Sequence, residues 1–270
     1  MKLMNLGFIG AGNMARAIIN GWQTKELDAE IYLHSAHKTS YEPYAKEKGL
    51  KTCETNSEVV LQADYVFLAV KPIILGEVLT EIKAAVKRQK PVIVSMVTGV
   101  SVAEIAEHLE LAENEVEIVR IMPNVNAEIA EAMTALHANQ AVTPAHFEIV
   151  QQLFELIGKT EIMAERDFST FVALAGSSPA YVYFFIDAMA RAGVKYGLKK
   201  EQATKIAAQA VLGSAKKVLS DEKTPMQLVD DVCSPGGTTI AGLLALEEAG
   251  FMTAVVKGMD ATINKDQGKA

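Results

Sequence analysis

The chain contains few cysteines and no evident cluster of metal-binding side chains. Cys53 and Cys233 are the two cysteines among 270 residues, and they form neither a C-x-x-C motif nor a Cys/His cluster. The five histidines also lack ligand spacing to one another or to a carboxylate. This pattern disfavours a metal site and a disulfide framework, and it fits a reducing compartment, so we expect a cytoplasmic protein. We expect no signal peptide, because Asn5 and Gly7 lead straight into an apolar run rather than to a cleavage site.

Basic runs and long uninterrupted apolar runs are also missing. The formal net charge of −7 without a basic run argues against nucleic acid as a partner. Residues 168–186 carry no charge, but polar side chains and Pro179 interrupt them. Because a spanning helix needs roughly 20 predominantly apolar residues, we expect no membrane span. We expect instead a buried helix at a domain or subunit interface.

The apolar half of the sequence is arranged in two different patterns. Residues 1–164 alternate short apolar runs with helical periodicity, which is typical of βαβ units, whereas residues 165–270 read as helices throughout. Burying the uncharged helix of a thin bundle requires a second copy of the chain. The predicted fold class is therefore α/β, with an N-terminal Rossmann-type doubly wound sheet (1–164) followed by an all-α C-terminal dimerisation domain (165–270).

The expected elements follow from this periodicity. Ser101 and Glu104 predict a capping box, and Thr143-Pro144 predicts an N-cap followed by proline at the first helical position. Strands are expected at residues 5–9, 30–33, 65–70, 92–95, 117–120 and 132–137. Helices are expected at residues 13–23, 41–48, 74–86, 102–109, 144–157, 168–194, 200–219, 226–232, 240–249 and 251–264.

The most informative motif is the G-x-G-x-x-A turn that follows the first apolar run. Gly10 permits a sharp turn, Gly12 lets a pyrophosphate approach the backbone, and Ala15 lets the helix pack closely on the strand. The free N–H groups at the helix start, near Asn13 and Met14, face the phosphate. Gly10, Gly12, Asn13, Met14 and Ala15 are therefore predicted to bind a dinucleotide, and a strand–helix turn without a ligand is the alternative.

The residues after the second predicted strand bear on which dinucleotide binds. An NAD site usually has an acidic residue about 20 positions after the glycine motif, to bind the ribose 2′-hydroxyl. This chain has Ser35 there, followed by His37 and Lys38. Their donors and charge favour a 2′-phosphate, so NADPH is predicted as the preferred cofactor and NADH as a weaker alternative. A solvated loop with incidental charges is the competing interpretation.

Two other strand ends are expected at the same edge of the sheet, where ligands of doubly wound folds bind. One carries Ala69-Val70-Lys71-Pro72, in which Lys71 either lies near the nicotinamide or is ordinary surface. The other ends at Asn124, which either hydrogen-bonds the nicotinamide ribose or carboxamide or closes the strand as a polar turn. We include all five residues among the predicted cofactor contacts.

A second glycine-rich turn lies near the C-terminus. Ser234-Pro235-Gly236-Gly237 forms a loop with exposed amides, and Thr238-Thr239 begin a helix. Backbone N–H groups at a helix start form a cradle for an anion such as a small carboxylate. Ser234, Gly236, Gly237, Thr238 and Thr239 are therefore predicted to bind the substrate, and an N-capped turn is the alternative. The small residues 175–181 form either a second wall of this site or a close helix contact.

These motifs together resemble the pyrroline-5-carboxylate reductase family. The resemblance spans essentially the whole chain and is carried by five segments: GFIGAGNMA (7–15), FLAVKP (67–72), RIMPN (120–124), AGSSPAY (175–181) and DVCSPGGTTIAGLLALE (231–247). The last contains S-P-G-G-x-T-x-x-x-L, the signature of this family. Asn56 matches an asparagine that such enzymes place near the adenosine ribose.

The resemblance implies NAD(P)H-dependent reduction of the cyclic imine 1-pyrroline-5-carboxylate to L-proline, the last step of proline biosynthesis. It implies that the substrate carboxylate binds the amides of residues 236–239 and that the Thr239 hydroxyl, as the catalytic group, bonds the ring nitrogen. A homodimer is implied, and a higher oligomer of dimers is compatible with it. Glu222 aligns only loosely with an acidic residue found near the site in some members.

Some residues depart from the family pattern, and two other functions remain open. Val125-Asn126 replace a common Thr-Pro, and Ala175 and Ser178 replace a Ser and a Gly, which affects pocket shape but removes no ionisable group. A β-hydroxyacid dehydrogenase would carry a catalytic lysine on the first long helix after the sheet, and residues 168–189 contain none. A non-catalytic NADP-binding protein on the same fold is disfavoured by the intact glycine turns and Thr239.

Overall fold

The computed structural model describes residues 4–25 and 27–269, which group into two compact units. One contains the described residues up to Ser177 together with those from Thr262 onward, and the other contains residues 178–261. The domain boundary expected between residues 164 and 165 stays a prediction.

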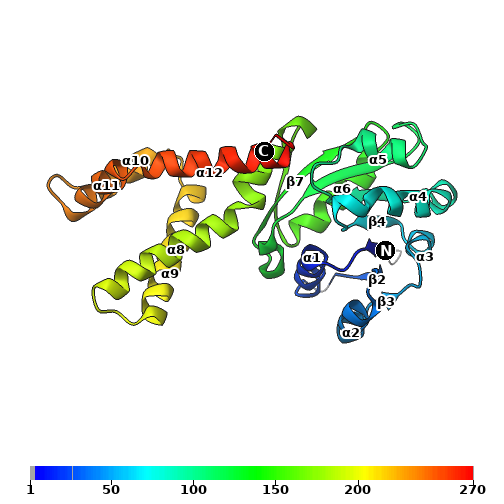
Figure 1. The fold of residues 1–270 in the computed structure, drawn as a ribbon, viewed down its shortest axis with the longest axis horizontal. Coiled ribbons are helices and arrows are strands. Elements are labelled where there is room, and N and C mark those ends of the chain that lie inside the picture. The colour runs from blue at the N-terminus through cyan, green and yellow to red at the C-terminus, as the bar shows by residue number, and fades with distance from the viewer. Residues whose placement is uncertain (1–3, 26, 270) are drawn as a thin grey trace. The chain divides into compact units, whose positions relative to one another are not determined.

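The first unit is built around an eight-stranded sheet in the order β3-β2-β1-β4-β5-β6-β7-β8. Figure 1 labels β2, β3, β4 and β7 of this sheet. All neighbouring strands are parallel except β6 and β7, which are antiparallel. Each predicted strand overlaps an observed one, whereas the edge strands β3 and β8 were not predicted. The strands are β1 (Met4–Ile9), β2 (Ala29–His34), β3 (Lys51–Thr52), β4 (Tyr65–Leu68), β5 (Val92–Ser95), β6 (Ile118–Met122), β7 (Ala132–Ala138) and β8 (Gly158–Ile162).

Helices cover both faces of this sheet, so the predicted doubly wound α/β class is confirmed. Side chains alternate between the two faces along each central strand: Phe67 packs in the cluster on one face, and Val66 and Leu68 pack in the cluster on the other. The first cluster includes residues of α1 (Asn13–Gln23), α2 (Lys38–Lys48) and α6 (Pro144–Glu155). The second includes residues of α3 (Asn56–Gln62), α4 (Pro72–Gln89) and α5 (Val102–His108).

The direction in which successive strands are added to the sheet reverses between β1 and β4. The chain runs outward from β1 through β2 to β3, then returns to form β4 on the other side of β1. Ligands of doubly wound sheets bind beyond the carboxyl ends of the strands at such a switch point. The loops that follow β1, β2 and β4 therefore form the candidate cofactor edge.

The stretch predicted as one helix at residues 168–194 is interrupted. It consists of α7 (Phe168–Phe171), a π-helical turn η3 (Val172–Gly176) and α8 (Ser178–Lys195), preceded by the short 3₁₀ turn η2 (Glu165–Asp167). The N–H of Ser177 donates to Val172 O at 2.8 Å, which is the wider spacing of a π turn. The small residues of the 175–181 motif thus begin within an irregular turn.

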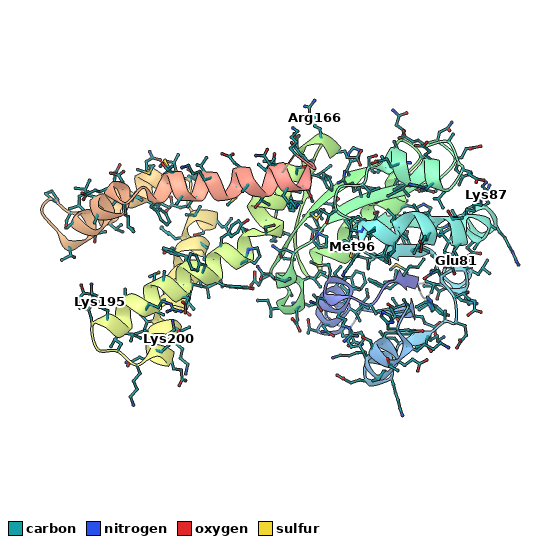
Figure 2. All side chains as sticks on the ribbon, viewed as in Figure 1. Glu81, Lys87, Met96, Arg166, Lys195 and Lys200 are labelled. Atoms are coloured by element: carbon teal, nitrogen blue, oxygen red, sulfur yellow. The ribbon has the colours of Figure 1, made fainter. Side chains whose placement is uncertain are left out.

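The second unit is helical, as expected. Its elements are α8, α9 (Lys200–Ser220), α10 (Pro225–Val232), α11 (Thr238–Glu248) and most of α12 (Phe251–Asp266). Gly193 permits α8 and α9 to approach closely, because a Cβ there would lie 2.9 Å from the Ala203 Cβ. In Figure 2, Lys195 and Lys200 mark the turn between these helices, where Lys200 pairs with Asp187 of α8.

By length and composition alone, the helical stretch Glu165–Lys195 is apolar enough to cross a membrane, and so is the bent pair formed by α11 and α12. This is weak evidence for a span, because the core helix of a soluble protein meets the same criteria. Association with a second copy of the chain explains the apolar composition of these helices better, because helices that form such an interface expose apolar side chains in the single chain.

Candidate functional site

The G-x-G-x-x-A turn lies at the switch point between β1 and β4. Gly10 has φ of +102°, and a Cβ there would lie 2.4 Å from the carbonyl oxygen of Ala69. The Ala69 N–H in turn donates to Ile9 O at 2.9 Å. Only glycine fits this combination of positive φ and close backbone approach. The structure therefore brings together two of the predicted cofactor segments, at Gly10 and at Ala69-Val70.

The N-terminus of α1 is open toward this edge. Gly12 is the N-cap residue, and a Cβ there would meet nothing within 4 Å. No side chain caps the helix and no acidic residue lies in its first turn, which is fully within the described residues. Asn13 is exposed and Ala15 is buried against the sheet. Free N–H groups, an uncovered approach and the positive end of a helix together fit a pyrophosphate.

Helix N-termini along the cofactor edge differ in how they are capped. The Thr55 hydroxyl accepts the N–H of Glu58 to cap α3, and Ser101 with Glu104 forms the predicted capping box of α5. In contrast, α1, α2 and α4, which follow the central strands β1, β2 and β4, have no side-chain cap in the described structure. The helix ends without caps are those next to the switch point, where a dinucleotide would supply the missing acceptors.

The residues expected to recognise the 2′-phosphate lie between β2 and α2. Ser35 follows the last residue of β2, His37 is the N-cap residue of α2, and Lys38 is its first residue. The helix was predicted to begin at residue 41, whereas the structure begins it at Lys38. Lys38 forms an ion pair with Glu54, whose hydrogen bond raises the pKa of the lysine.

Asn56 and Lys71 also lie at helix starts. Asn56 is the first residue of α3, and its side-chain amide donates to Glu81 of α4 at 2.6 Å; Glu81 is labelled in Figure 2. Lys71 is exposed and is the N-cap residue of α4, with Pro72 at the first helical position. The strand ends at Leu68, two residues before its predicted end at residue 70, and Pro72 begins the helix.

Asn124 connects two of the sequence motifs. It is buried, its Oδ1 accepts the N–H of Asn126 at 3.2 Å, and its Nδ2 donates to Ala175 O at 2.9 Å. The RIMPN segment thereby contacts the π turn of the 175–181 segment within the first unit. Asn124 has a structural function in addition to its predicted contact with the nicotinamide.

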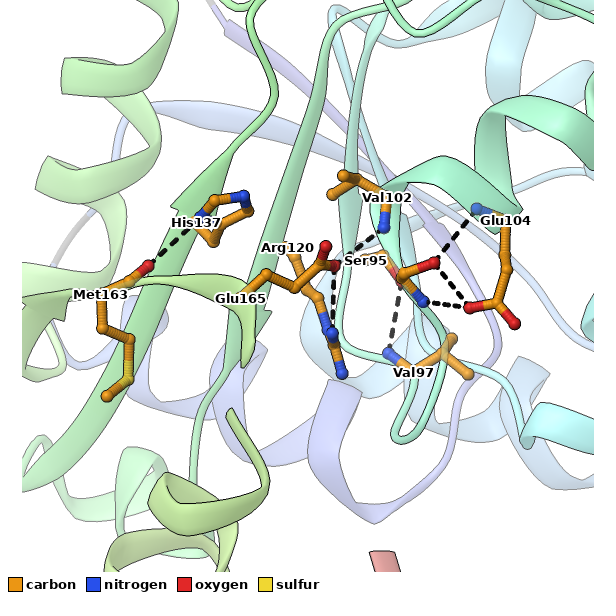
Figure 3. Close-up of polar contacts among 9 residues, drawn as sticks. Ser95, Val97, Val102, Glu104, Arg120, His137, Met163 and Glu165 are labelled. Atoms are coloured by element: carbon orange, nitrogen blue, oxygen red, sulfur yellow. Dashed lines mark hydrogen bonds and ion pairs between the residues drawn. The ribbon is translucent and has the colours of Figure 1, made fainter. Parts of the chain in front are cut away.

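An ion pair between the buried Arg120 and the half-buried Glu165, near the end of β6, was not predicted. The guanidinium of Arg120 donates to Glu165 Oε1 at 3.0 Å, and the same oxygen accepts the N–H of Val102 at 2.8 Å (Figure 3). Arg120 also lies over the ring of Phe168, with 4.6 Å between Cζ and the ring centroid. Its Nε is buried without a hydrogen-bond partner among the described residues. This network joins β6, the start of α5 and the segment that leads into α7.

The second glycine-rich turn lies in the helical unit. The N–H of Gly237 donates to Ser234 O at 3.0 Å, and Gly236 has φ of +69°. A Cβ on Gly237 would lie 2.5 Å from the Ser234 Oγ and 3.1 Å from the Ser234 carbonyl oxygen, so a side chain there would require the Ser234 hydroxyl to move. Thr238 and Thr239 are exposed in the first turn of α11, as the sequence predicts.

The N-cap alternative for the threonines is wrong. Gly237 is the N-cap residue of α11, and among the described residues no side chain caps this helix and none in its first turn is acidic. The N–H groups in the first turn of α11 donate to no side-chain cap within the described residues and are available to a ligand, and Thr239 is the second residue of the helix. This arrangement fits a small carboxylate with a hydroxyl donor beside it. Glu222 is exposed on the bend between α9 and α10.

No group of three or more His, Cys, Asp or Glu side chains that could hold a metal ion occurs within residues 4–25 and 27–269. Cys53 is buried and its pKa is raised by desolvation, so it is a poor ligand or nucleophile.

Comparisons with known proteins match two family models to different parts of the chain. A family model described as "Pyrroline-5-carboxylate reductase dimerisation" matches residues 165–269, and one described as "NADP oxidoreductase coenzyme F420-dependent" matches residues 5–99. A pyrroline-5-carboxylate reductase of Escherichia coli (strain K12) is 39% identical over 97% of both chains.

Solved structures give the same result. The 1-pyrroline-5-carboxylate reductase of Streptococcus pyogenes has a TM-score of 0.90 and 37% identity, covering 99% of this chain and 100% of that one. A Plasmodium falciparum pyrroline carboxylate reductase with NADP bound also has a TM-score of 0.90, at 28% identity, covering 100% of this chain and 99% of that one.

Proposed function

Because the chain belongs to the pyrroline-5-carboxylate reductase family, we propose that it reduces 1-pyrroline-5-carboxylate to L-proline with NADPH as the preferred hydride donor. One observation carries this proposal. A chain that is related to such a reductase over 97% of its length has two glycine-capped helix starts, one suited to a pyrophosphate and one to a small carboxylate. The chain is an oxidoreductase with a nicotinamide cofactor.

The cofactor contacts are proposed along the edge formed by the loops after β1, β2 and β4. The amides at the start of α1, from Gly12 to Ala15, hold the pyrophosphate, and Gly10 keeps the turn tight. Ser35, His37 and Lys38 contact the 2′-phosphate, and Asn56 contacts the adenosine ribose. The segment from Ala69 to Pro72 and Asn124 border the nicotinamide.

The imine site is proposed at the start of α11. The substrate carboxylate binds the amides of Gly236, Gly237 and Thr238, where the helix dipole stabilises it. The Thr239 hydroxyl hydrogen-bonds the ring nitrogen and orients the C=N bond. The reduced nicotinamide, when bound, supplies the hydride to the imine carbon. Because the protonated iminium is already electrophilic, the protein needs to orient the ring and exclude water rather than supply a strong base.

Assembly follows from the dimerisation domain. The family match to residues 165–269 supports a homodimer, and we propose that an oligomer of dimers is compatible with the same helical surface. Two cysteines without a disulfide framework fit a cytoplasmic enzyme, which is our proposal for its location.

The decisive experiment is oxidation of reduced cofactor by the purified dimer in the presence of racemic 1-pyrroline-5-carboxylate, followed by the loss of nicotinamide absorbance and by detection of proline. We expect turnover with both cofactors and a higher kcat/KM with NADPH. A folded dimer that binds cofactor and produces no proline would contradict the proposed reaction.

Ser35→Asp tests the cofactor preference. An aspartate at this position repels a 2′-phosphate and accepts hydrogen bonds from a ribose 2′-hydroxyl. We expect kcat/KM with NADPH to fall by at least about tenfold, which corresponds to about 1.4 kcal/mol, while NADH is used as well as before or better. Equal losses with both cofactors would indicate general damage, and a wild type that favours NADH several-fold would contradict the preference itself.

A further inference from the structure

The proposed 2′-phosphate site contains an acidic side chain that the sequence patterns do not assign to any function. The loop that carries Glu54 is tied to the end of β2 by two backbone carbonyls: the Cys53 N–H donates to Leu33 O at 3.0 Å, and Cys53 O contacts His34 Nδ1 at 2.9 Å. The N–H of Glu54 donates to Glu58 Oε2 at 2.8 Å. Glu54 is therefore held beside the segment that runs from Ser35 to Lys38.

Glu54 also forms an ion pair with the lysine that a 2′-phosphate would need as its partner. The ammonium of Lys38 is paired with the Glu54 carboxylate. Arg16, a second cation near the first turn of α2, donates to the carbonyl oxygens of Ala11 and Ser40. A phosphate arriving at the start of α2 therefore meets a lysine whose charge is already compensated.

The ion pair is exposed enough to be exchanged. The Lys38 side chain is 49% exposed and the Glu54 side chain is 72% exposed. Pairs of this kind contribute little to stability, because water screens them and both side chains lose conformational freedom. A phosphate can therefore draw Lys38 away from Glu54, but it must first break the existing pair, which makes its binding weaker by a modest amount.

We propose that Glu54 is a specificity-determining residue that limits the preference of the enzyme for NADPH over NADH by competing with the 2′-phosphate for Lys38. The two cofactors differ only in this phosphate, which carries a charge of about −1.5 to −2 at neutral pH. Glu54 weakens binding of NADPH and leaves binding of NADH unaffected. This inference rests on the proposed function, because it assumes that the loop after β2 holds the adenosine end of the cofactor.

Glu54→Gln tests the inference, since glutamine keeps the size of the side chain and removes the charge. We expect the ratio of kcat/KM for NADPH to that for NADH to rise by about two- to fivefold, through NADPH alone. The rise should shrink as salt is added, because screening weakens interactions between exposed charges. Glu110→Gln is the matched control: it removes the partner of Lys83 in an exposed pair elsewhere on the same unit.

A double-mutant cycle with Lys38→Met separates competition for the lysine from direct repulsion. If Glu54 acts by holding Lys38, its replacement should change the NADPH preference less in the Lys38→Met background than in the wild type. An unchanged ratio in Glu54→Gln, or the same change in Glu110→Gln, would overturn the inference. So would an equal effect of Glu54→Gln in the two backgrounds.

Direct titration of each cofactor distinguishes failure of this inference from failure of the proposed function. If the protein binds both cofactors but does not reduce the imine, the Kd values of the four variants still test Glu54. If the wild type binds neither NADPH nor NADH, the proposed function and this inference are both wrong.

Discussion

The two compact units of this chain bury their apolar side chains to very different extents. In the sheet unit, Trp22, Phe67 and Phe154 are fully buried in one aromatic cluster. In the helical unit, the described buried residues are small ones such as Ala190, Ala203 and Ala207, while large apolar side chains are exposed. Those exposed include Tyr183, Phe184, Tyr196, Leu219 and Met252.

This difference indicates that a single chain completes the hydrophobic core of the sheet unit but not that of the helical unit. Monomeric proteins rarely expose contiguous apolar patches of this kind, and obligate interfaces resemble a domain core cut in half. The family match assigns dimerisation to residues 165–269. The core of the helical unit is therefore completed by a second copy, and its stability depends on protein concentration whereas that of the sheet unit does not.

The largest effect should come from placing a charge on the exposed apolar face of α8. Phe184 is 77% exposed within the chain, and Phe184→Asp would bury an unpaired carboxylate in the dimer. We expect this to cost about 4–8 kcal/mol of association free energy and to abolish activity.

Light scattering at low micromolar concentration checks this prediction. The wild type should have a mass of at least twice 29.1 kDa, with larger multiples indicating an oligomer of dimers, and the variant should be a monomer. Phe184→Leu keeps an apolar side chain and should remain assembled. A Phe184→Asp protein that stays dimeric and active would show that this face of α8 lies outside the interface.

A smaller effect, independent of concentration, is expected in the sheet unit. Glu165→Ala leaves the guanidinium of Arg120 buried without its carboxylate and leaves the N–H of Val102 without an acceptor. We expect a loss of about 3–5 kcal/mol of stability, seen as a lower midpoint of thermal unfolding at every protein concentration.

Glu113→Ala is the matched control for this substitution, because Glu113 is exposed and its hydrogen bond to Asn139 uses only the backbone carbonyl. It should change stability by less than about 0.5 kcal/mol. If Glu165→Ala unfolds like Glu113→Ala, the ion pair does not stabilise the sheet unit. If its midpoint varies with concentration as in the helical unit, the contrast between the two units is wrong.

The smallest of these effects concerns Thr239 and should leave both units folded. Thr239→Ala removes one hydrogen bond to the ring nitrogen, which should lower kcat by roughly 10–100-fold, or about 1–3 kcal/mol, with a smaller change in KM. Thr239→Ser keeps the hydroxyl and should recover much of the rate. The melting temperature should stay near that of the wild type, because Gly237 and not Thr239 is the N-cap residue. A fully active Thr239→Ala enzyme would exclude a catalytic role.

The sequence predicted those elements whose apolar pattern is strong. The central strands carry alternating or continuous apolar side chains, and the capping box of Ser101 and the N-cap of Thr143 were recognisable from single residues. β3 was missed because it has only two residues, both exposed, and β8 because Gly-Lys-Thr-Glu-Ile is mostly polar at a sheet edge. α3 was missed because it has seven residues and follows a polar loop.

The candidate site also has parts that the sequence predicts and parts that it does not. Its backbone turns were predictable, because Gly10 and Gly236 have positive φ and each belongs to a turn that precedes a helix. The Arg120–Glu165 pair was not, since its members are far apart in the chain and nothing local marks them as partners. The contact of Asn124 with Ala175 and the pairing of Lys38 with Glu54 also arise from tertiary packing, which no local pattern encodes.

The uncapped ends of α1 and α11 have a practical consequence for any measurement on this protein. Helix ends with free amides and no carboxylate in the first turn bind small oxyanions, and a ligand that binds only the folded state raises its stability. Sulfate or phosphate buffer would then stabilise the protein and inhibit it at the same time. A melting curve in phosphate and a rate in a buffer without such anions therefore describe two different species, so variants of either turn must be compared in one and the same solution.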